Sequence, residues 1–343
     1  MLTQRLILTG DEAQDKQLIQ QAAAIIRAGG LVAFPTETVY GLGADALNPE
    51  AVRRIFLVKG RPAWDPLIVH VDTPEGIFRY TRAEQAQVEP LIRAFMPGPL
   101  TLVLPKREMI SDIVTAGRDT VAIRIPLHPV ARALIRYSQT PIAAPSANKF
   151  GRPSPTTADH VLDDLNGEIE AVLDAGQTPM GVESTILDMT TQPPTLLRPG
   201  GASKEAIEAV IGTVRSLGQP IAEGEALPAP GLSARHYAPS ARVLLCAPTP
   251  EAFYGTLVDA LSQYGFVGAM RPKGWRVPQS PRLQVFEWGA WGDWETLAQR
   301  LFLGLRALEQ APTHAIVCPL PPEEGLARAV RDRLLRASQP PKP

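Results

Sequence analysis

The feature that most constrains the fold is a regular alternation of short apolar strands and amphipathic helices, interrupted once by a segment rich in proline and glycine. Apolar residues recur at helical spacing over residues 18–26, and a glycine pair ends that helix before the apolar run 31–34. The alternation continues to residue 212 and resumes at residue 241. This pattern predicts an α/β sheet, and strand pairs without a helix between them indicate that it is mixed.

The interruption at residues 213–240 divides the chain into two folding units. Its prolines and glycines come with little hydrophobic periodicity, which is typical of an interdomain linker. We therefore predict a larger α/β domain over residues 1–212, a linker over 213–240, a smaller Rossmann-like α/β domain over 241–337 and a disordered tail over 338–343.

Composition narrows the classes of function. The 343 residues carry 34 basic and 35 acidic side chains, which disfavours a surface that grips nucleic acid throughout but allows a local basic pocket. Cys246 and Cys318 lie far apart in apolar runs, which indicates buried core residues rather than a disulfide framework or a metal site. No signal sequence or membrane-spanning apolar run is evident, so we expect a cytoplasmic protein without a membrane partner.

Residues 34–46 (FPTETVYGLGADA) bring two threonines, a tyrosine and a carboxylate to the turn after a strand, where α/β sheets bind ligands. The segment also matches the dinucleotide-binding pattern G-x-G-x-x-A. That match is weak, because Asn48 and Pro49 begin the next helix several residues beyond the glycines, whereas a true fingerprint opens its helix at the glycines. A nicotinamide or flavin site is therefore the less favoured alternative.

Two basic segments point to an anionic ligand. Lys59 and Arg61 flank a glycine and suit phosphate oxygens, although they could equally be cations that favour a helix C-terminus. Arg124 shares one face of the strand TVAIR with Thr120. A buried arginine needs an anionic partner, which is either a structural carboxylate or a ligand. His70, on the strand LIVHV, is more often a satisfied core residue than a ligand-binding one.

Further segments are rich in hydrogen-bond donors. They are residues 144–155 (APSANKFGRPSP), 181–185 (GVEST), 197–200 (LRPG) and 235–237 (RHY). Rigid loops of hydroxyl, amide and basic groups suit an anion or a nucleotide. Capping of the helix that starts near Thr157 would explain one of the hydroxyls in the first loop but not all. No P-loop sequence occurs, so a triphosphate would be held in another way.

Together these segments make the sequence similar to the long form of the threonylcarbamoyl-AMP synthase family, which has a YrdC-like domain, a linker and a smaller C-terminal domain. The resemblance spans about residues 30–240 in the family's order and rests on FPTETVYGLGADA, KGRP, PLIVHV, PGPLTLVLP, TVAIRIP, PIAAPSAN, GRPSPT, GVESTI, LLRPG and RHYAP. It implies a YrdC-like mixed, open, twisted sheet with helices in the first domain.

The resemblance implies a nucleotidyltransferase that converts L-threonine, bicarbonate or CO₂, and ATP into threonylcarbamoyl-AMP and pyrophosphate. A partner threonylcarbamoyl transferase would then modify adenosine in tRNA, so this chain would meet tRNA only indirectly. Such chemistry needs positioning and neutralisation of phosphate charge rather than a protein nucleophile. Mg²⁺ is expected on the ATP phosphates, without a dedicated set of metal-binding side chains.

The resemblance also assigns site residues. Those implied for threonine are Thr38, His70, Arg124, Ala144 and Ser184, with Arg124 on the carboxylate. Those implied for ATP are Lys59, Arg61, Asp65, Thr120, Ser146, Asn148, Ser154, Arg198 and Tyr237. Lys59 and Arg61 are also the catalytic candidates, and Tyr237 would reach from the linker to close the site and exclude water.

Three places depart from the family's pattern. Asp65 falls where the family often carries asparagine, and Phe150 falls where a small polar residue is common. In the linker, Ser233 and Ala234 replace a lysine-tyrosine pair. A charged linker contact to bicarbonate or phosphate is therefore absent or supplied by Arg235.

Two other functions remain open. One is an RNA-binding adaptor of tRNA maturation without turnover, which the net charge of −1 and the small number of lysines disfavour. The other is carbamoyl transfer of the kind found in hydrogenase maturation. Proteins of that kind carry zinc-finger cysteines, which two distant cysteines do not supply.

Overall fold

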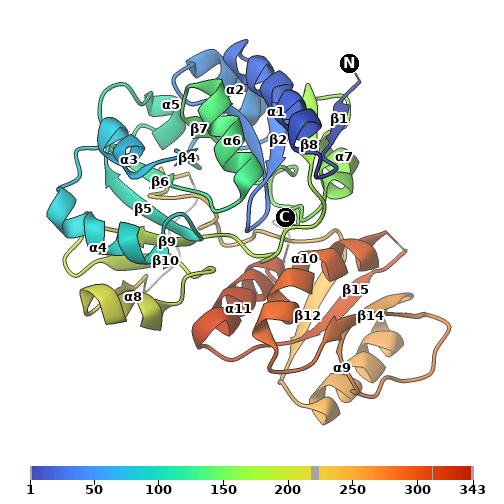
Figure 1. Cartoon of the computed structure of the whole chain (residues 1–343). Coiled ribbons are helices and arrows are strands. Elements are labelled where there is room, and N and C mark those ends of the chain that lie inside the picture. Colours follow the sequence, from blue (N-terminus) through green and yellow to red (C-terminus); the bar gives the residue numbers. More distant parts are fainter. Residues whose placement is uncertain (1, 218–223, 311, 341–343) are drawn as a thin grey trace.

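The structure, a computed structural model, describes residues 2–217, 224–310 and 312–340 as two α/β units (Figure 1). The predicted linker is described except for residues 218–223, and residues 341–343 of the predicted tail lie outside the described residues. Between helix α8 (Lys204–Ile211) and strand β12 (Arg242–Cys246), the regular structure in the described part is the short strand β11 (Arg215–Ser216).

The first unit is built on an eleven-stranded sheet in the order β1-β8-β2-β3-β7-β4-β6-β5-β9-β10-β11. Parallel pairs such as β4–β6 stand beside antiparallel pairs such as β5–β6, so the sheet is mixed, as predicted. The strands besides β11 are β1 (Gln4–Ile7), β2 (Val32–Pro35), β3 (Tyr40–Asp45), β4 (Ile68–His70), β5 (Leu100–Pro105), β6 (Thr120–Arg124), β7 (Ile142–Ala143), β8 (Ala171–Asp174), β9 (Thr185–Asp188) and β10 (Thr195–Arg198).

Helices cover both faces of this sheet, and local signals set their ends (Figure 1). Asp11 and Asn48 accept hydrogen bonds from the first-turn amides of α1 (Glu12–Arg27) and α2 (Pro49–Lys59). Gly60, with φ of 62°, ends α2. The remaining helices besides α8 are α3 (Pro74–Tyr80), α4 (Gln85–Phe95), α5 (Asp112–Thr115), α6 (Pro129–Ser138) and α7 (Ala158–Leu165).

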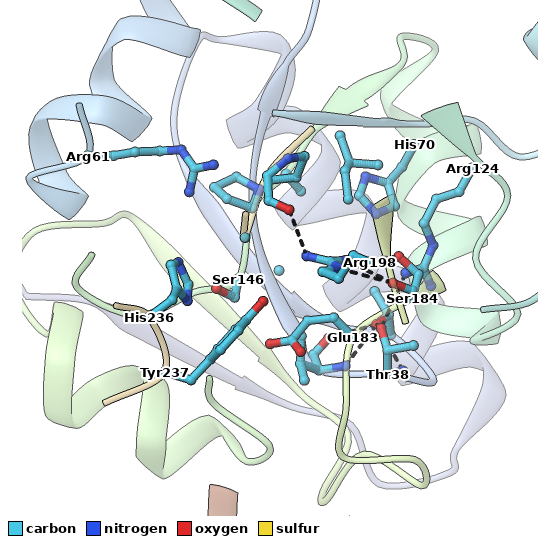
Figure 2. A pocket seen from close by; sticks show the side chains of 18 residues that line it. Thr38, Arg61, His70, Arg124, Ser146, Glu183, Ser184, Arg198, His236 and Tyr237 are labelled. Atoms are coloured by element: carbon cyan, nitrogen blue, oxygen red, sulfur yellow. Dashed lines mark hydrogen bonds between the residues drawn. The ribbon is translucent and has the colours of Figure 1, made fainter. Parts of the chain in front are cut away.

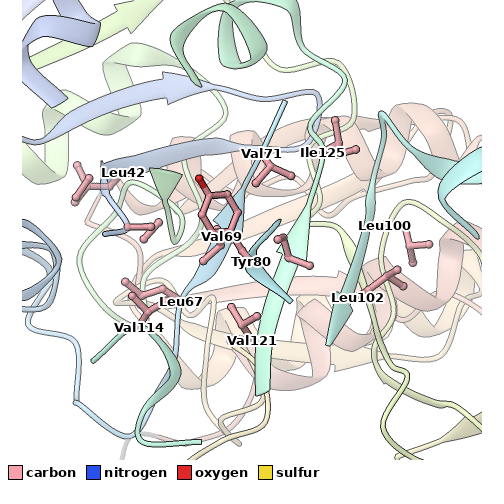
Figure 3. Close-up of a cluster of buried hydrophobic side chains, with 14 of the residues drawn as sticks. Leu42, Leu67, Val69, Val71, Tyr80, Leu100, Leu102, Val114, Val121 and Ile125 are labelled. Atoms are coloured by element: carbon pink, nitrogen blue, oxygen red, sulfur yellow. The ribbon is translucent and has the colours of Figure 1, made fainter. Parts of the chain in front are cut away.

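Alternation along the strands divides the core between the two faces. On β6, Val121 and Ile123 pack into the largest cluster of buried side chains (Figure 3), whereas Ala122 and Arg124 face the other side. On that second side, helices α1 and α6 cover one part of the sheet, and linker side chains such as Leu232 cover another. The linker therefore packs over the face on which Arg124 emerges.

One predicted element needs correction. The sequence predicted that residues 34–46 form a turn after a strand, but Tyr40–Asp45 is strand β3 and pairs antiparallel with β2. The turn is confined to the four residues Thr36, Glu37, Thr38 and Val39. Both glycines of the G-x-G-x-x-A match lie inside β3, so no helix N-terminus opens at them, and the structural context of a dinucleotide fingerprint is missing from this segment.

The second unit is a four-stranded, all-parallel sheet in the order β12-β15-β13-β14, which confirms the smaller α/β domain. Its elements besides β12 are α9 (Pro250–Gln263), β13 (Val267–Pro272), β14 (Leu283–Gly289), α10 (Trp294–Glu309), β15 (Ala315–Pro319) and α11 (Gly325–Ala337). Side chains of α10 and α11 share one core cluster with Val39 and Val182 of the first unit and with Tyr237 of the linker. The two units thus share a buried interface.

Two simpler features complete the fold. Cys246 and Cys318 are free thiols. Cys318 is buried in the second unit, as predicted, whereas Cys246 is only partly buried. Within the described residues, no helix combines the length and the apolar character that crossing a membrane requires.

Candidate active site

A pocket of about 50 Å³ lies on the second face of the large sheet, where the linker meets the strands (Figure 2). Most of the predicted site residues line it. They are Thr38, Arg61, His70, Arg124, Ala144, Ser146, Ser184, Arg198 and Tyr237. Strands far apart in the sequence and the linker therefore converge on one small polar space. Three of these side chains are arginines, so the pocket favours an anion.

At one end of the pocket, Arg124 is almost fully buried and has a protein partner. Its Nη2 donates to Glu37 Oε1 at 2.5 Å, and its Nη1 donates to the Thr38 hydroxyl at 3.3 Å. The other Glu37 oxygen accepts the backbone N–H of Leu127 at 2.9 Å. Within the described residues, Arg124 Nε has no hydrogen-bond partner. The sequence left open whether the anionic partner of Arg124 is a structural carboxylate or a ligand. The structure supplies a carboxylate, and the Nε–H of Arg124 remains available to a ligand.

His70 lies beside Arg124 on the neighbouring strand. Burial, followed by the nearby charge of Arg124, lowers the pKa of His70 to about 3. The imidazole is therefore neutral at physiological pH. Its Nδ1 has no hydrogen-bond partner in the described part of the chain, and its ring meets Phe34 edge-on with 6.2 Å between ring centroids. His70 is both a core residue and a polar wall of the pocket.

At the other end of the pocket, Arg61 is held by its own turn. Its Nε and Nη2 donate to the carbonyls of Asp65 and Pro66 at 2.9 and 2.7 Å, and Nη2 lies 2.8 Å from Asp65 Oδ1. Burial raises the pKa of Asp65 to about 6, although the cation of Arg61 opposes the shift. Figure 2 shows Arg61 and Arg124 on opposite sides of the pocket with Arg198 between them.

Arg198 connects the sheet to the linker. Its Nε and Nη2 donate to the Ser184 carbonyl at 3.2 and 3.0 Å, Nη2 also reaches the Ser184 hydroxyl at 3.3 Å, and Nη1 donates to the Pro230 carbonyl at 3.2 Å. Gly200 makes this packing possible, because a Cβ there would lie 2.3 Å from the backbone of Ser184 and Thr185. Arg198 therefore fixes both the pocket wall and the segment that covers it.

His236 and Tyr237 enter the pocket from the linker. Tyr237 adopts a left-handed backbone conformation with φ of 60°, and its hydroxyl has no hydrogen-bond partner among the described residues. The ring centroids of His236 and Tyr237 lie 4.1 Å apart, and burial, followed by the charge of Arg61, lowers the pKa of His236 well below its usual value. Figure 2 shows the Tyr237 side chain pointing into the pocket.

The other predicted residues do not line the pocket, and four of them support it from behind. Lys59 Nζ donates to the carbonyls of Ser146 and Asn148, and burial lowers its pKa well below the usual value. The Asn148 amide donates to the carbonyls of Lys149 and Arg152. Ser154 and Asp65 each contact a charged side chain of the lining, namely Glu183 and Arg61. Thr120 lies half-buried at the start of β6.

Sequence reasoning did not single out several residues of the site. Thr36 and His236 line the pocket, and so does Glu183, the one acidic side chain of its lining. Glu37 holds Arg124 from outside it. Both glutamates were visible inside the segments that carried the resemblance, but an acidic residue in a turn gives no signal of its own until its arginine partner is placed.

The fold and the pocket define an α/β protein whose arginine-lined, hydroxyl-rich pocket suits a small anionic ligand. The pocket is covered by a linker that packs against a second domain.

Comparison with known proteins specifies the class further. The Sua5–YciO–YrdC family model, described as telomere recombination, matches residues 24–200, and a model described as threonylcarbamoyl-AMP synthase, C-terminal domain, matches residues 202–339. The chain is 44% identical over 337 residues to the threonylcarbamoyl-AMP synthase of Pyrococcus abyssi, covering 97% of each chain. It is 41% identical over 332 residues to that of Bacillus subtilis, covering 96% of each.

The solved structures agree with the sequence comparison. The fold matches the crystal structure of P. abyssi Sua5 complexed with L-threonine with a TM-score of 0.90 and 42% identity, covering 98% of each chain. The chain belongs to the threonylcarbamoyl-AMP synthase family, in the form that joins a YrdC domain to a Sua5 C-terminal domain.

Proposed function

We propose that this protein is a nucleotidyltransferase that makes threonylcarbamoyl-AMP from L-threonine, bicarbonate or CO₂, and ATP, and releases pyrophosphate. One observation carries the proposal: buried arginines stand at opposite ends of a single pocket, with a third between them. Two anionic groups, a carboxylate and a phosphate chain, would fit this spacing of charge. Relatives similar over almost the whole chain carry the name of this activity.

The end of the pocket near Arg124 would take threonine. The unpartnered Nε of Arg124 is a donor for the amino-acid carboxylate, and the hydroxyls of Thr38 and Ser184 lie in the same lining. Neutral His70 would contact the substrate without adding positive charge near the amine that must attack CO₂. The relative from P. abyssi was solved with L-threonine bound, which supports this assignment.

The end near Arg61 would take the ATP phosphates, with Ser146 and Arg198 beside it. The amine and CO₂ form a carbamate, a carbamate oxygen attacks the α-phosphorus, and pyrophosphate leaves. Arg61 and Arg198 would neutralise the charge that builds up on the phosphates. Lys59 would act by fixing the loop at Ser146 and Asn148 through its two carbonyl contacts, rather than by touching the phosphates directly.

Magnesium would arrive on the ATP phosphates. The described residues contain no group of three or more His, Cys, Asp or Glu side chains that could hold a metal ion. Glu183 lines the pocket, but its two oxygens accept from Ser154 and Arg333. The donor set therefore suits a cation carried by phosphate oxygens rather than one held by the protein.

The linker would close the site during turnover. Its segment around Pro230 and Tyr237 leaves a pocket of about 50 Å³, whereas pockets that bury a drug-sized ligand span about 300–1,000 Å³. ATP must therefore displace part of this cover before it binds. We place the reaction in the cytoplasm, where ATP is available, upstream of a threonylcarbamoyl transferase that acts on tRNA.

The test is pyrophosphate release from ATP by the purified chain. We expect release to require both L-threonine and bicarbonate, and to yield threonylcarbamoyl-AMP in equal amount. Arg328→Gln is a control, because Arg328 lies on α11 away from the pocket and pairs with Glu205. Release that ignores threonine would overturn the proposal, as would RNA binding that weakens steeply with salt in a chain without turnover.

A further inference from the structure

A buried arginine of the second domain reaches the wall of the pocket. Arg333 lies on the inner face of α11 and is fully buried. Its Nε donates to Glu183 Oε2 at 2.7 Å, and its Nη1 donates to Asp332 at 2.6 Å. Its guanidinium carbon lies 4.9 Å from the centroid of the Tyr237 ring. One side chain from the second domain thus contacts both a pocket carboxylate and the linker tyrosine.

Glu183 passes this contact on to the first domain. Its second oxygen, Oε1, accepts the Ser154 hydroxyl at 2.5 Å. Figure 2 shows Glu183 between Tyr237 and the Thr38 side of the pocket. A buried carboxylate needs hydrogen bonds and a positive partner to stay ionised. Arg333 is this positive partner, because it forms a direct ion pair with Glu183.

We propose that Arg333 is a positioning residue of the active site, which holds Glu183 ionised and thereby fixes Ser154 and Tyr237 for ATP. The second domain is then part of the site's architecture rather than an appendage. This inference rests on the proposed function for the role of ATP, whereas the coupling between Arg333 and Glu183 can be tested without it.

The charges around Glu183 support this role. Arg333, which also pairs with Asp332, faces it from α11, Arg198 faces it from β10, and Tyr237 faces it from the linker. Burial alone would raise the pKa of Glu183, but Arg333 and then Arg198 reverse the effect and hold it below its usual value. Loss of the Arg333 charge leaves the carboxylate buried with its nearest cation gone, so its pKa must rise.

The test compares Arg333→Gln with Arg333→Lys across pH 4–8.5, a range extended downward because the pKa of Glu183 in the parent lies below its usual value. Gln removes the charge, so Glu183 becomes protonated at higher pH, and we expect the acid limb of kcat/KM to move up by at least one pH unit. Lys keeps the positive charge but not the geometry of the Nε–H donor. We therefore expect Arg333→Lys to be less active than the parent, with its acid limb at the same pH as that of the parent. Both variants showing the acid limb of the parent would overturn the proposal.

Steady-state constants separate positioning from loss of folded protein. A smaller folded fraction lowers kcat alone, because the remaining molecules are normal. Displacement of Ser154 and Tyr237 should instead raise KM for ATP about tenfold or more in Arg333→Gln, with KM for threonine within twofold of the parent. An unchanged KM for ATP contradicts the role that we assign.

Arg306→Gln is the matched control. Arg306 is an equally buried arginine of the second domain, and its Nη2 donates to Asp164 at 2.9 Å and to the Pro153 carbonyl at 2.6 Å. It does not line the pocket. We expect it to loosen the domain interface without moving the acid limb. The same shift in both variants would mean a general loosening and would overturn the proposal.

The double variant Glu183→Gln/Arg333→Gln tests the coupling by stability alone. It removes both charges, so it should unfold at a higher urea concentration than Arg333→Gln at pH 7. This measurement does not depend on turnover, so it tests the coupling even if the proposed function is wrong. The proposed function is tested separately, by threonine-dependent pyrophosphate release from the parent. A double variant no more stable than Arg333→Gln would show that no stranded charge exists and would reject the coupling.

Discussion

At the scale of single residues, Arg124 has a structural role beside the substrate-binding role that we propose for it. A strand arginine on a buried face requires an anion, and the sequence left open whether the protein or a ligand supplies it. Glu37 supplies an anion, because Arg124 Nη2 donates to Glu37 Oε1 at 2.5 Å. The Nε–H of Arg124 has no acceptor among the described residues. A structural partner and a ligand contact are therefore compatible interpretations of Arg124.

This dual role changes how Arg124 must be tested. Arg124→Ala would strand Glu37 and cost about 3–5 kcal/mol of stability, so lost activity would have no single meaning. We compare Glu37→Gln with Glu37→Gln/Arg124→Gln, because both lack the Glu37 charge and only the second lacks the arginine. The double variant should raise KM for threonine at least about tenfold relative to Glu37→Gln, since a hydrogen bond to a charged group is worth about 1.5–3 kcal/mol.

Urea denaturation gives the control for that comparison. The double variant, which has no unpaired buried charge, should be at least as stable as Glu37→Gln. Equal KM values for threonine in the two variants would remove Arg124 from the threonine site.

Residue identity predicted the cations of the site better than their partners. Arg61 stood out as a cation suited to phosphate beside a glycine, and Arg124 as a strand arginine that needs an anionic partner, whereas Arg198 came from the resemblance. Glu183 did not stand out, because its partner Arg333 lies 150 positions away and on another domain. Sequence spacing carries no information on such a pair unless the packing of the two domains is known.

At the scale of elements, local signals predicted helices well and one turn poorly. Asn48 and Thr157 cap helices close to where the sequence placed them. Strand β3 was missed, because its residues YGLGAD contain two glycines and no β-branched residue, which is a weak strand pattern. Tertiary pairing with β2 and β7 makes it a strand.

Helix α7 carries a pH-sensitive contact. His160 Nδ1 accepts the Thr156 N–H at 3.3 Å, and burial, then Arg306, lowers the pKa of His160 to about 4. The unfolded chain binds this proton near pH 6.5. The contribution to stability is therefore complete above pH 6.5 and is lost as the pH falls towards 4, by up to about 3 kcal/mol.

His160→Asn should remove that contribution, because asparagine offers an oxygen near the Thr156 amide and does not titrate. We expect the free energy of unfolding, measured by urea between pH 7 and pH 4.5, to fall less steeply in the variant. The change in slope should correspond to about one proton fewer taken up on unfolding. Parallel slopes in parent and variant would contradict the assignment.

At the scale of the whole molecule, the two domains pack tightly against each other at Gly181. Gly181 has φ of +77°, and a Cβ there would lie 2.4 Å from the Cα of Gln299 in α10. Gly176 has φ of +80° with no atom within 4 Å of such a Cβ. The two glycines share the backbone strain and differ in the clash, which makes them a matched pair.

Gly181→Ala should therefore cost more stability than Gly176→Ala. The left-handed conformation costs each alanine about 1 kcal/mol, and the clash with α10 adds about 1–3 kcal/mol in the first variant. Thermal and urea unfolding measure the difference. Equal losses would mean that the interface yields easily to an added methyl group.

The linker is also held from outside the pocket. Arg336 Nη1 donates to the Ser233 carbonyl at 2.7 Å, so Arg336→Gln should loosen the cover without changing a lining residue. Because ATP must displace that cover, we expect the variant to bind ATP several-fold more tightly in a titration without threonine. Weaker or unchanged binding would show that the cover does not have to open for ATP.

The small volume of the pocket sets a population constraint on any ligand of ATP size. If the covered form outnumbers the open form by 100 to 1, opening costs about 2.7 kcal/mol, and each such ligand binds about 100-fold more weakly than its own contacts allow. The affinity of an inhibitor that competes with ATP is reduced by the same factor. A search that starts from the covered pocket of about 50 Å³ would select molecules of only a few atoms, whereas the ligands of interest bind the rarer open form.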